Sequence, residues 1–158
     1  MRTPLALTLP LVGTVLLTGC FSSRPIGGPE ASAGNPSPLG SFTVSSRVLG
    51  DQVLTPSSCR AGDRQLFLGA DFAGSTSPLV LRLVVDPLDG PAVRVFSTDA
   101  QFDKTVVFRR SDCQVFHFSL DSTGWRINDV YDYRVTLQLD CSREGESIKG
   151  EASATHCS

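Results

Sequence analysis

The chain has 158 residues, of which 41% are hydrophobic, enough to supply the core of one ordinary domain. Its 14 Lys and Arg residues nearly balance its 16 Asp and Glu residues, and the formal net charge is -2. Because both signs are scattered along the chain, the sequence lacks the basic stripe that nucleic-acid binding requires, and we expect no nucleic acid among its partners.

The chain begins with a leader. A positive charge at the start precedes an almost wholly apolar run over residues 5–17. This run is too short to cross a bilayer as a mature helix, which needs about 20 residues, and the layout is typical of a secretory signal peptide. The run ends in Leu17-Thr18-Gly19-Cys20, which resembles the lipobox of bacterial lipoproteins. The resemblance implies that residues 1–19 are removed and that the Cys20 thiol carries a lipid.

This resemblance also implies where the protein is found. In the lipoproteins that it resembles, the matching cysteine carries a diacylglycerol thioether and usually an amide-linked acyl chain as well. By this resemblance, lipid on Cys20 attaches the mature protein to a membrane of the bacterial cell envelope. Two acyl chains give stable attachment, whereas a single chain binds a membrane marginally. The residue after the cysteine is Phe21 rather than the Asp that favours inner-membrane retention in enteric bacteria. We therefore expect an outer-membrane location. The sequence does not indicate whether the domain faces the periplasm or the cell exterior.

A linker separates the lipid site from a single domain. Residues 20–40 are rich in Pro, Gly and Ser and poor in apolar side chains, which is typical of a flexible tether. Residues 41–158 form a segment of normal single-domain size. The sequence therefore predicts a signal peptide, a lipidated tether and one folded domain, in that order.

The sequence of the domain predicts an all-β fold, because apolar and polar residues alternate with a period of two and no helical period recurs. About eight strands with turns between them indicate a single antiparallel β-sandwich, of jelly-roll or flattened-barrel type. The expected strands cover residues 42–48, 66–72, 79–85, 92–96, 105–108, 113–120, 131–141 and 148–157.

Turns are predicted at residues 86–90, 121–124 and 142–145, where Asp, Ser, Pro and Gly cluster. Trp125 and Ile127 follow the second of these turns, and we expect them to cap one end of the core. Tyr131 and Tyr133 share the apolar stripe of the clearest strand, so core packing is the expected role of both rings.

Five cysteines are an odd number for a secreted protein, and lipidation of Cys20 accounts for the unpaired one. The other four indicate two disulfides in an oxidising compartment. If residues 131–141 and 148–157 form a hairpin, Cys141 lies beside its turn and Cys157 near its open end, too far apart for a disulfide. Antiparallel pairing of residues 113–120 with 131–141 would bring Cys113 to Cys141. The sequence thus predicts the pairs Cys113–Cys141 and Cys59–Cys157.

No catalytic motif appears. The chain has only two histidines, and His117 alternates with Phe116 and Phe118, which places it on the opposite, solvent face. His156 lies close to the C-terminal end of the sequence, and Ser75 has the context of an ordinary loop serine. The sequence contains neither a G-x-S-x-G elbow nor an H-E-x-x-H or phosphate-loop motif. We therefore predict no catalytic residue, no metal site and no cofactor.

Three carboxylate pairs remain as weak candidates for a calcium site or for acid–base chemistry. Aspartate is also a favoured turn residue, which is the simpler interpretation. The pairs are Asp86 with Asp89, Asp99 with Asp103, and Asp129 with Asp132. The basic pair Arg109-Arg110 is expected to be solvated or paired locally.

These features favour a non-enzymatic binding or structural lipoprotein, anchored through Cys20, whose ligand is an envelope protein or a glycan. A different hypothesis is an inhibitor of a hydrolase that attacks the envelope. A carboxylate-based hydrolase ranks third. The sequence leaves the ligand and the oligomeric state open.

Overall fold

The computed structural model describes residues 37–99, 104–127 and 129–158. The predicted signal peptide, Cys20 and most of the tether lie outside these residues, as does Asp103. In the described part of the chain, no helix is both long enough and apolar enough to cross a membrane.

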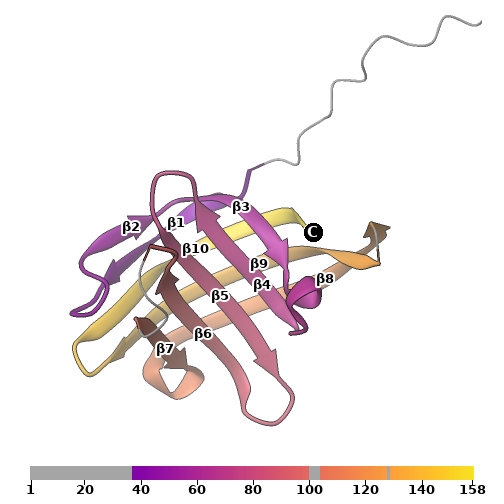
Figure 1. Cartoon of the computed structure of the whole chain (residues 1–158). Coiled ribbons are helices and arrows are strands. Elements are labelled where there is room, and N and C mark those ends of the chain that lie inside the picture. Colours follow the sequence, from indigo (N-terminus) through magenta and orange to yellow (C-terminus); the bar gives the residue numbers. More distant parts are fainter. Residues whose placement is uncertain (1–36, 100–103, 128) are drawn as a thin grey trace, which may run out of the picture. The chain divides into compact units, whose positions relative to one another are not determined.

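Ten strands form two antiparallel sheets of five strands each (Figure 1). In the first sheet the order is β2-β1-β10-β9-β8, and in the second it is β3-β4-β5-β6-β7. The strands of the first sheet are β1 (Leu39–Ser45), β2 (Gln52–Leu54), β8 (Cys113–Ile127), β9 (Val130–Arg143) and β10 (Glu146–Cys157). Those of the second are β3 (Pro56–Ala61), β4 (Gly69–Gly74), β5 (Leu79–Asp86), β6 (Gly90–Ser97) and β7 (Thr105–Arg109).

The fold is thus the predicted all-β sandwich, and its connections distinguish between the two types considered. Neighbours in each sheet are neighbours in the chain, except that β10 pairs with β1. The chain changes sheet only between β2 and β3 and between β7 and β8, where the short 3-10 helix η2 (Arg110–Asp112) lies. Such an up-and-down order is that of a flattened barrel rather than of a jelly roll.

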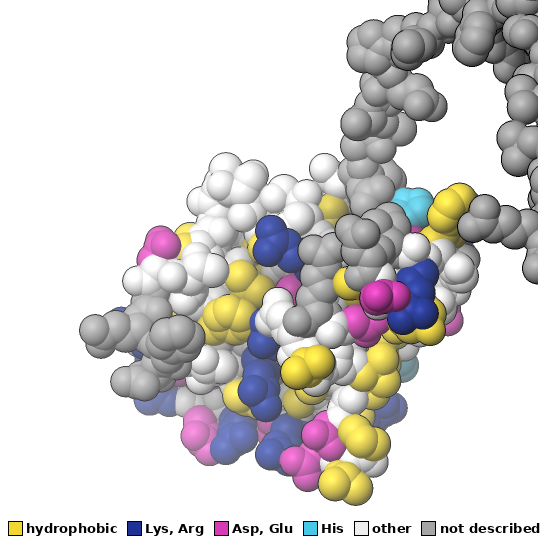
Figure 2. Space-filling view, turned by 45° about the vertical axis from the view of Figure 1, so that its right-hand side comes forward, with side chains coloured by type: hydrophobic (Ala, Val, Ile, Leu, Met, Phe, Trp, Pro, Cys, Tyr) yellow, Lys and Arg dark blue, Asp and Glu magenta, His cyan; other side chains and the backbone are white. Residues whose placement is uncertain are grey.

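The core lies between the two sheets. Side chains such as Phe42, Phe72, Phe108, Leu81 and Ile148 are fully buried there. Burial of each contributes about 1.5–3 kcal/mol relative to exposure. Charged side chains lie mainly outside, and Figure 2 shows them among apolar ones on one face.

The number of strands differs from the expected eight, because β2 and β3 come from a segment without clear alternation. The expected strand over residues 66–72 begins only at Gly69, after the 3-10 helix η1 (Gly62–Gln65). Leu66, predicted to be part of a buried stripe, ends η1 with a left-handed backbone and is 96% exposed.

A second difference concerns the long hairpin of β8 and β9. Residues 121–124 were expected to form a turn but continue β8, with a register irregularity between Ser122 and Arg126. Trp125 does not cap the core, since it is 71% exposed. An irregularity of this kind lets a strand accommodate an extra residue and redirect its side chains.

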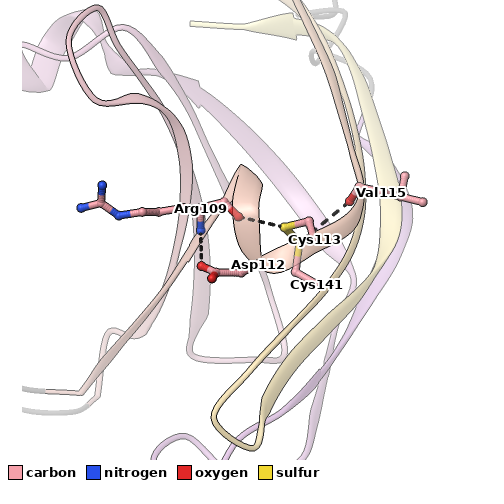
Figure 3. Close-up of a disulfide and its surroundings, with 5 residues drawn as sticks. All are labelled: Arg109, Asp112, Cys113, Val115 and Cys141. Carbon is pink, nitrogen blue, oxygen red and sulfur yellow. Dashed lines mark hydrogen bonds between the residues drawn. A yellow bond between two sulfur atoms is a disulfide. The ribbon is translucent and has the colours of Figure 1, made fainter.

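Both disulfides join the predicted cysteines. Cys113 lies directly opposite Cys141 in the register of β8 and β9, and this disulfide holds the edge strand β8 to its neighbour. Next to it, the Arg109 backbone N–H donates a 2.8 Å hydrogen bond to the Asp112 carboxylate (Figure 3). This bond stabilises the short connection from β7 to β8. The Cys59–Cys157 disulfide links β3 in one sheet to β10 in the other. The disulfides therefore fasten two edge strands, one within its sheet and one across the sandwich.

Candidate binding surfaces

The outer face of the β8-β9-β10-β1 sheet carries a groove with polar and apolar lining residues. His117, Gln138 and Glu151 are successive partners across β8, β9 and β10, so their side chains form one row. All three are exposed, and they line an open cavity of about 470 Å³. The prediction that His117 faces away from Phe116 is confirmed, since Phe116 is 4% exposed and belongs to the core.

A second row of short polar side chains runs beside the first. Ser119, Thr136 and Ser153 are successive partners across the same strands and line the same groove. The Ser119 and Thr136 hydroxyl oxygens are 2.8 Å apart, within hydrogen-bond distance. The wall of the groove includes Gly40, where an added Cβ would lie 2.1 Å from the Glu151 carbonyl oxygen. Glycine therefore permits the close approach of β1 to β10 at this wall.

The groove thus combines hydroxyl, amide, imidazole and carboxylate groups on a rigid sheet. Such a set donates and accepts hydrogen bonds in several directions, which suits a ligand rich in hydroxyl or amide groups. The residues of the two rows come from three consecutive strands, so no single local motif contains them.

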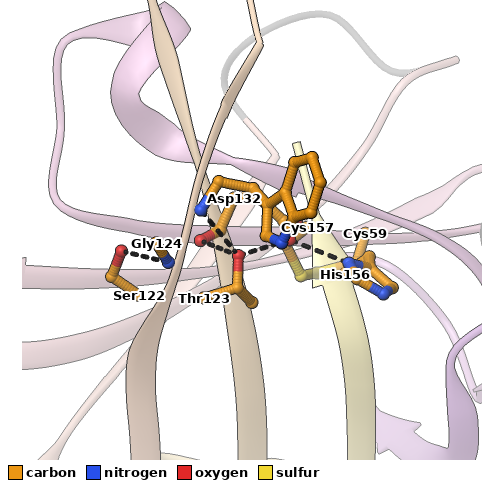
Figure 4. Close-up of polar contacts among 8 residues, drawn as sticks. Cys59, Ser122, Thr123, Gly124, Asp132, His156 and Cys157 are labelled. Carbon is orange, nitrogen blue, oxygen red and sulfur yellow. Dashed lines mark hydrogen bonds and ion pairs between the residues drawn. A yellow bond between two sulfur atoms is a disulfide. The ribbon is translucent and has the colours of Figure 1, made fainter.

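A second polar cluster surrounds a buried carboxylate (Figure 4). Asp132 is 3% exposed, and its Oδ2 accepts a 2.7 Å hydrogen bond from the Thr123 hydroxyl. The same oxygen lies 2.8 Å from Nδ1 of His156, and the Cys59–Cys157 disulfide is adjacent. Asp132 Oδ1 is buried and has no hydrogen-bond partner among the described residues.

The Asp132 carboxylate contacts Nδ1 of His156, which is how the aspartate of a Ser-His-Asp triad orients the histidine. A small cavity of about 220 Å³ beside His156 is lined also by Ser57 and Ser58. The Ser57 hydroxyl donates to the Ala73 carbonyl, and no serine of the described chain is hydrogen-bonded to His156. The contacts therefore hold the end of β10 against the β8–β9 hairpin, without a positioned nucleophile.

Asp103 lies outside the described residues, so only two of the three carboxylate pairs considered from the sequence can be placed, and neither converges on a site. The Asp86 carboxylate accepts the backbone N–H groups of Asp89 and Leu88, which lowers its pKa and stabilises the β5–β6 turn. Asp129 lies 3.3 Å from Arg126 at the surface, whereas Asp132 is buried. In residues 37–99, 104–127 and 129–158, no three His, Cys, Asp or Glu side chains cluster as metal ligands would.

The β8–β9 hairpin presents an aromatic surface. Trp125 is 71% and Tyr131 44% exposed, and the Arg126 guanidinium lies 4.9 Å from the Tyr131 ring centroid. The expectation that Tyr131 packs in the core is therefore wrong, because the face of β9 changes between Tyr131 and Val135. Tyr133 is partly buried, and burial together with the nearby Asp63 carboxylate raises its pKa.

Comparisons with family models, with curated proteins and with solved structures find no match to this chain.

Proposed function

We propose that the protein is a lipid-anchored binding module of a bacterial cell envelope, without enzymatic activity. The observation that carries the binding role is the row of His117, Gln138 and Glu151 in the groove. The resemblance of Leu17-Thr18-Gly19-Cys20 to a lipobox supports the anchor, and Phe21 after it supports an outer-membrane location. A sandwich fastened by two disulfides is a suitable rigid support for a preformed groove.

The proposed ligand of the groove is an envelope glycan, because the hydroxyl and amide groups of a glycan can hydrogen-bond to the two polar rows in the groove, while its apolar lining can contact the sugar rings. The test uses the full chain in a non-ionic detergent and measures cosedimentation with purified peptidoglycan and with insoluble envelope polysaccharide. A Gln138→Ala/Glu151→Ala variant should lose roughly tenfold or more in apparent affinity, as expected for two lost polar contacts. Gln114→Ala/Glu144→Ala is the matched control, since both of these residues are exposed and neither lines the groove.

Equal losses in both variants, or no binding by the unaltered chain, would contradict the groove as the glycan site. The anchor has a separate test. The unaltered protein should stay with membranes through a high-salt wash, whereas Cys20→Ala should be released. Retention of the Cys20→Ala variant would contradict the lipid anchor.

A second candidate function is inhibition of a hydrolase that attacks the envelope. Its support is the exposed aromatic surface of the β8–β9 hairpin, because Trp, Tyr and Arg dominate the energetics of protein–protein interfaces. Lysozyme-type enzymes assayed on purified cell walls provide the test. Inhibition that Trp125→Ala abolishes would favour this function over glycan binding, and full enzyme activity in the presence of excess protein would exclude inhibition of those enzymes.

A further inference from the structure

A row of arginines crosses the outer face of the β3-β4-β5-β6-β7 sheet. Arg60, Asp71, Arg82 and Arg94 are successive partners across β3, β4, β5 and β6. Arg109 lies on the same face of β7, two residues along the strand from the row. This sheet is the front layer in Figure 1, and in Figure 2 a band of dark blue Lys and Arg side chains runs down the visible face.

The charge of this face differs from that of the rest of the molecule. The face carries four arginines and only two carboxylates, those of Asp71 and of Asp86 at the end of β5, which gives an excess of two positive charges. The outer face of the other sheet carries two cations, Arg134 and Lys149. It also carries three carboxylates, those of Asp121, Asp140 and Glu151, which gives an excess of one negative charge. The folded chain therefore separates charge between its two faces, although its net charge is only -2.

Arg82 and Asp71 form the fixed centre of the row. The Arg82 guanidinium donates to both carboxylate oxygens of Asp71, at 2.8 and 2.7 Å, and also to Gln65. It lies over the rings of Phe67 and Phe96, with 4.6 and 5.3 Å to their centroids. Asp71 is 8% exposed and its carboxylate is paired with Arg82, so a ligand at the surface has little access to this negative charge.

The other three arginines are available. Arg60, Arg94 and Arg109 are exposed, and none of them forms an ion pair with another residue of the described chain. Their neighbours on the face include the short side chains of Ala73 and Ala92, and Phe96, the large ring next to Arg94, lies below the Arg82 guanidinium. The guanidinium groups are therefore the parts of this face that a ligand would meet first.

The spacing of the row favours an extended ligand. Neighbouring strands are about 4.8 Å apart, so Arg60 and Arg94, three strands apart, are separated by roughly 14 Å. The Arg82–Asp71 pair lies between these two residues in the row, so a ligand that contacts both Arg60 and Arg94 must extend over this pair. Arginine binds carboxylate and phosphate groups through two parallel hydrogen bonds, which makes the face selective for such groups.

From this arrangement we propose that the outer face of the β3–β7 sheet binds a linear acidic polysaccharide, which lies across the strands with its acidic groups on Arg60, Arg94 and Arg109. Anionic lipid surfaces share this charge but also require apolar side chains that insert. The large exposed apolar residues Leu66 and Leu88 lie in the loops beyond the strands rather than among the arginines. The proposal is independent of the groove on the other sheet, which has different residues.

The test measures binding of a fluorescein-labelled oligogalacturonate to the full chain in non-ionic detergent, by fluorescence anisotropy at about 50 mM and about 200 mM salt. Arg60→Gln/Arg94→Gln should weaken binding roughly tenfold or more at the lower salt concentration and reduce its salt dependence. The control Arg134→Gln/Arg143→Gln removes the same charge away from this face and should change affinity less than about twofold. Circular dichroism of both variants verifies that the fold is intact.

Equal losses in the two variants would show an effect of net charge and would overturn the proposal, as would the absence of any binding by the unaltered chain. Tighter binding of anionic phospholipid vesicles or of a single-stranded oligonucleotide than of the oligogalacturonate would also overturn it. Failure of the groove variants in the peptidoglycan assay leaves this result unaffected, because the residues and the probe differ.

Discussion

Removal of the Cys59–Cys157 disulfide should cost more stability than removal of Cys113–Cys141. The two pairs are closely matched in burial, because each has one cysteine in the core and one partly buried at an edge strand. They differ in the length of chain that they close, which is 98 residues in the first and 28 in the second. A comparison of the two double Cys→Ala variants therefore isolates the effect of chain length and position.

The expected magnitude follows from the entropy of closing a loop in the unfolded chain. A 98-residue loop gives about 4.7 kcal/mol and a 28-residue loop about 3.6 kcal/mol. The inner disulfide bypasses part of the outer loop and shortens it to about 70 residues, which reduces the outer contribution to about 4.4 kcal/mol. Removal of the inner pair lengthens the outer loop again and raises the outer contribution by about 0.3 kcal/mol, which offsets part of the inner loss. We expect net losses of about 4.4 kcal/mol for the outer pair and about 3.3 kcal/mol for the inner pair, each increased by about 1 kcal/mol for the lost sulfur contacts.

Equilibrium urea unfolding followed by far-UV circular dichroism is the appropriate assay. Fluorescence is less suitable, because the single tryptophan, Trp125, is already 71% exposed in the folded protein. A loss of less than about 2 kcal/mol for the outer pair would refute the reasoning. A larger loss for the inner pair than for the outer pair would refute it as well.

Three further predictions concern single residues. The raised pKa of Tyr133 means that folding favours its protonated phenol, so this contribution to stability is present below pH 10 and is lost as the pH rises through the raised value. Absorbance titration should show one of the two tyrosines ionising late, and Tyr133→Phe should remove that step. Gly150→Ala should cost about 3 kcal/mol in urea unfolding, because its Cβ would lie 2.1 Å from a β1 carbonyl oxygen. Gly124→Ala, with open space around it, should cost about 1 kcal/mol. Asp71→Asn should cost about 2 kcal/mol in the same assay, since it leaves a partly buried guanidinium without its carboxylate.

Each of these predictions has a result that contradicts it. Simultaneous ionisation of both tyrosines would show that Asp63 and burial do not act on Tyr133. Equal costs at Gly150 and Gly124 would contradict the close approach of β10 to β1. Unchanged stability of Asp71→Asn would mean that the ion pair with Arg82 contributes nothing.

The architecture and the disulfides could be predicted from the sequence because both depend on local alternation and on antiparallel geometry. The pattern from Val135 to Cys141 fixes which side chains face the core, and the structure agrees. The disulfide pairs followed from which strand ends meet in a hairpin. The short strand β2 and the edge strand β3 lack such a pattern, because β2 has only three residues and the burial of β3 does not alternate, and they were missed.

The binding surfaces could not be predicted, for a different physical reason. Each assembles residues from three or four strands, as with His117, Gln138 and Glu151 in the groove. Their alignment depends on the residue-by-residue register of the paired strands, which the alternation of apolar and polar residues does not specify. Asp132 was a candidate only as the partner of Asp129, and its burial was not expected, because the irregular pairing of β8 with β9 turns this carboxylate inward, where strict alternation would place it in solvent.

Mass spectrometry of the N-terminal peptide from protein purified out of membranes tests the central claim, the lipid anchor on Cys20, most directly. We expect a peptide that begins at Cys20 and carries the added mass of a diacylglycerol group. A peptide that retains residues 1–19, or one with an unmodified Cys20 thiol, would show that the protein is not anchored through this cysteine.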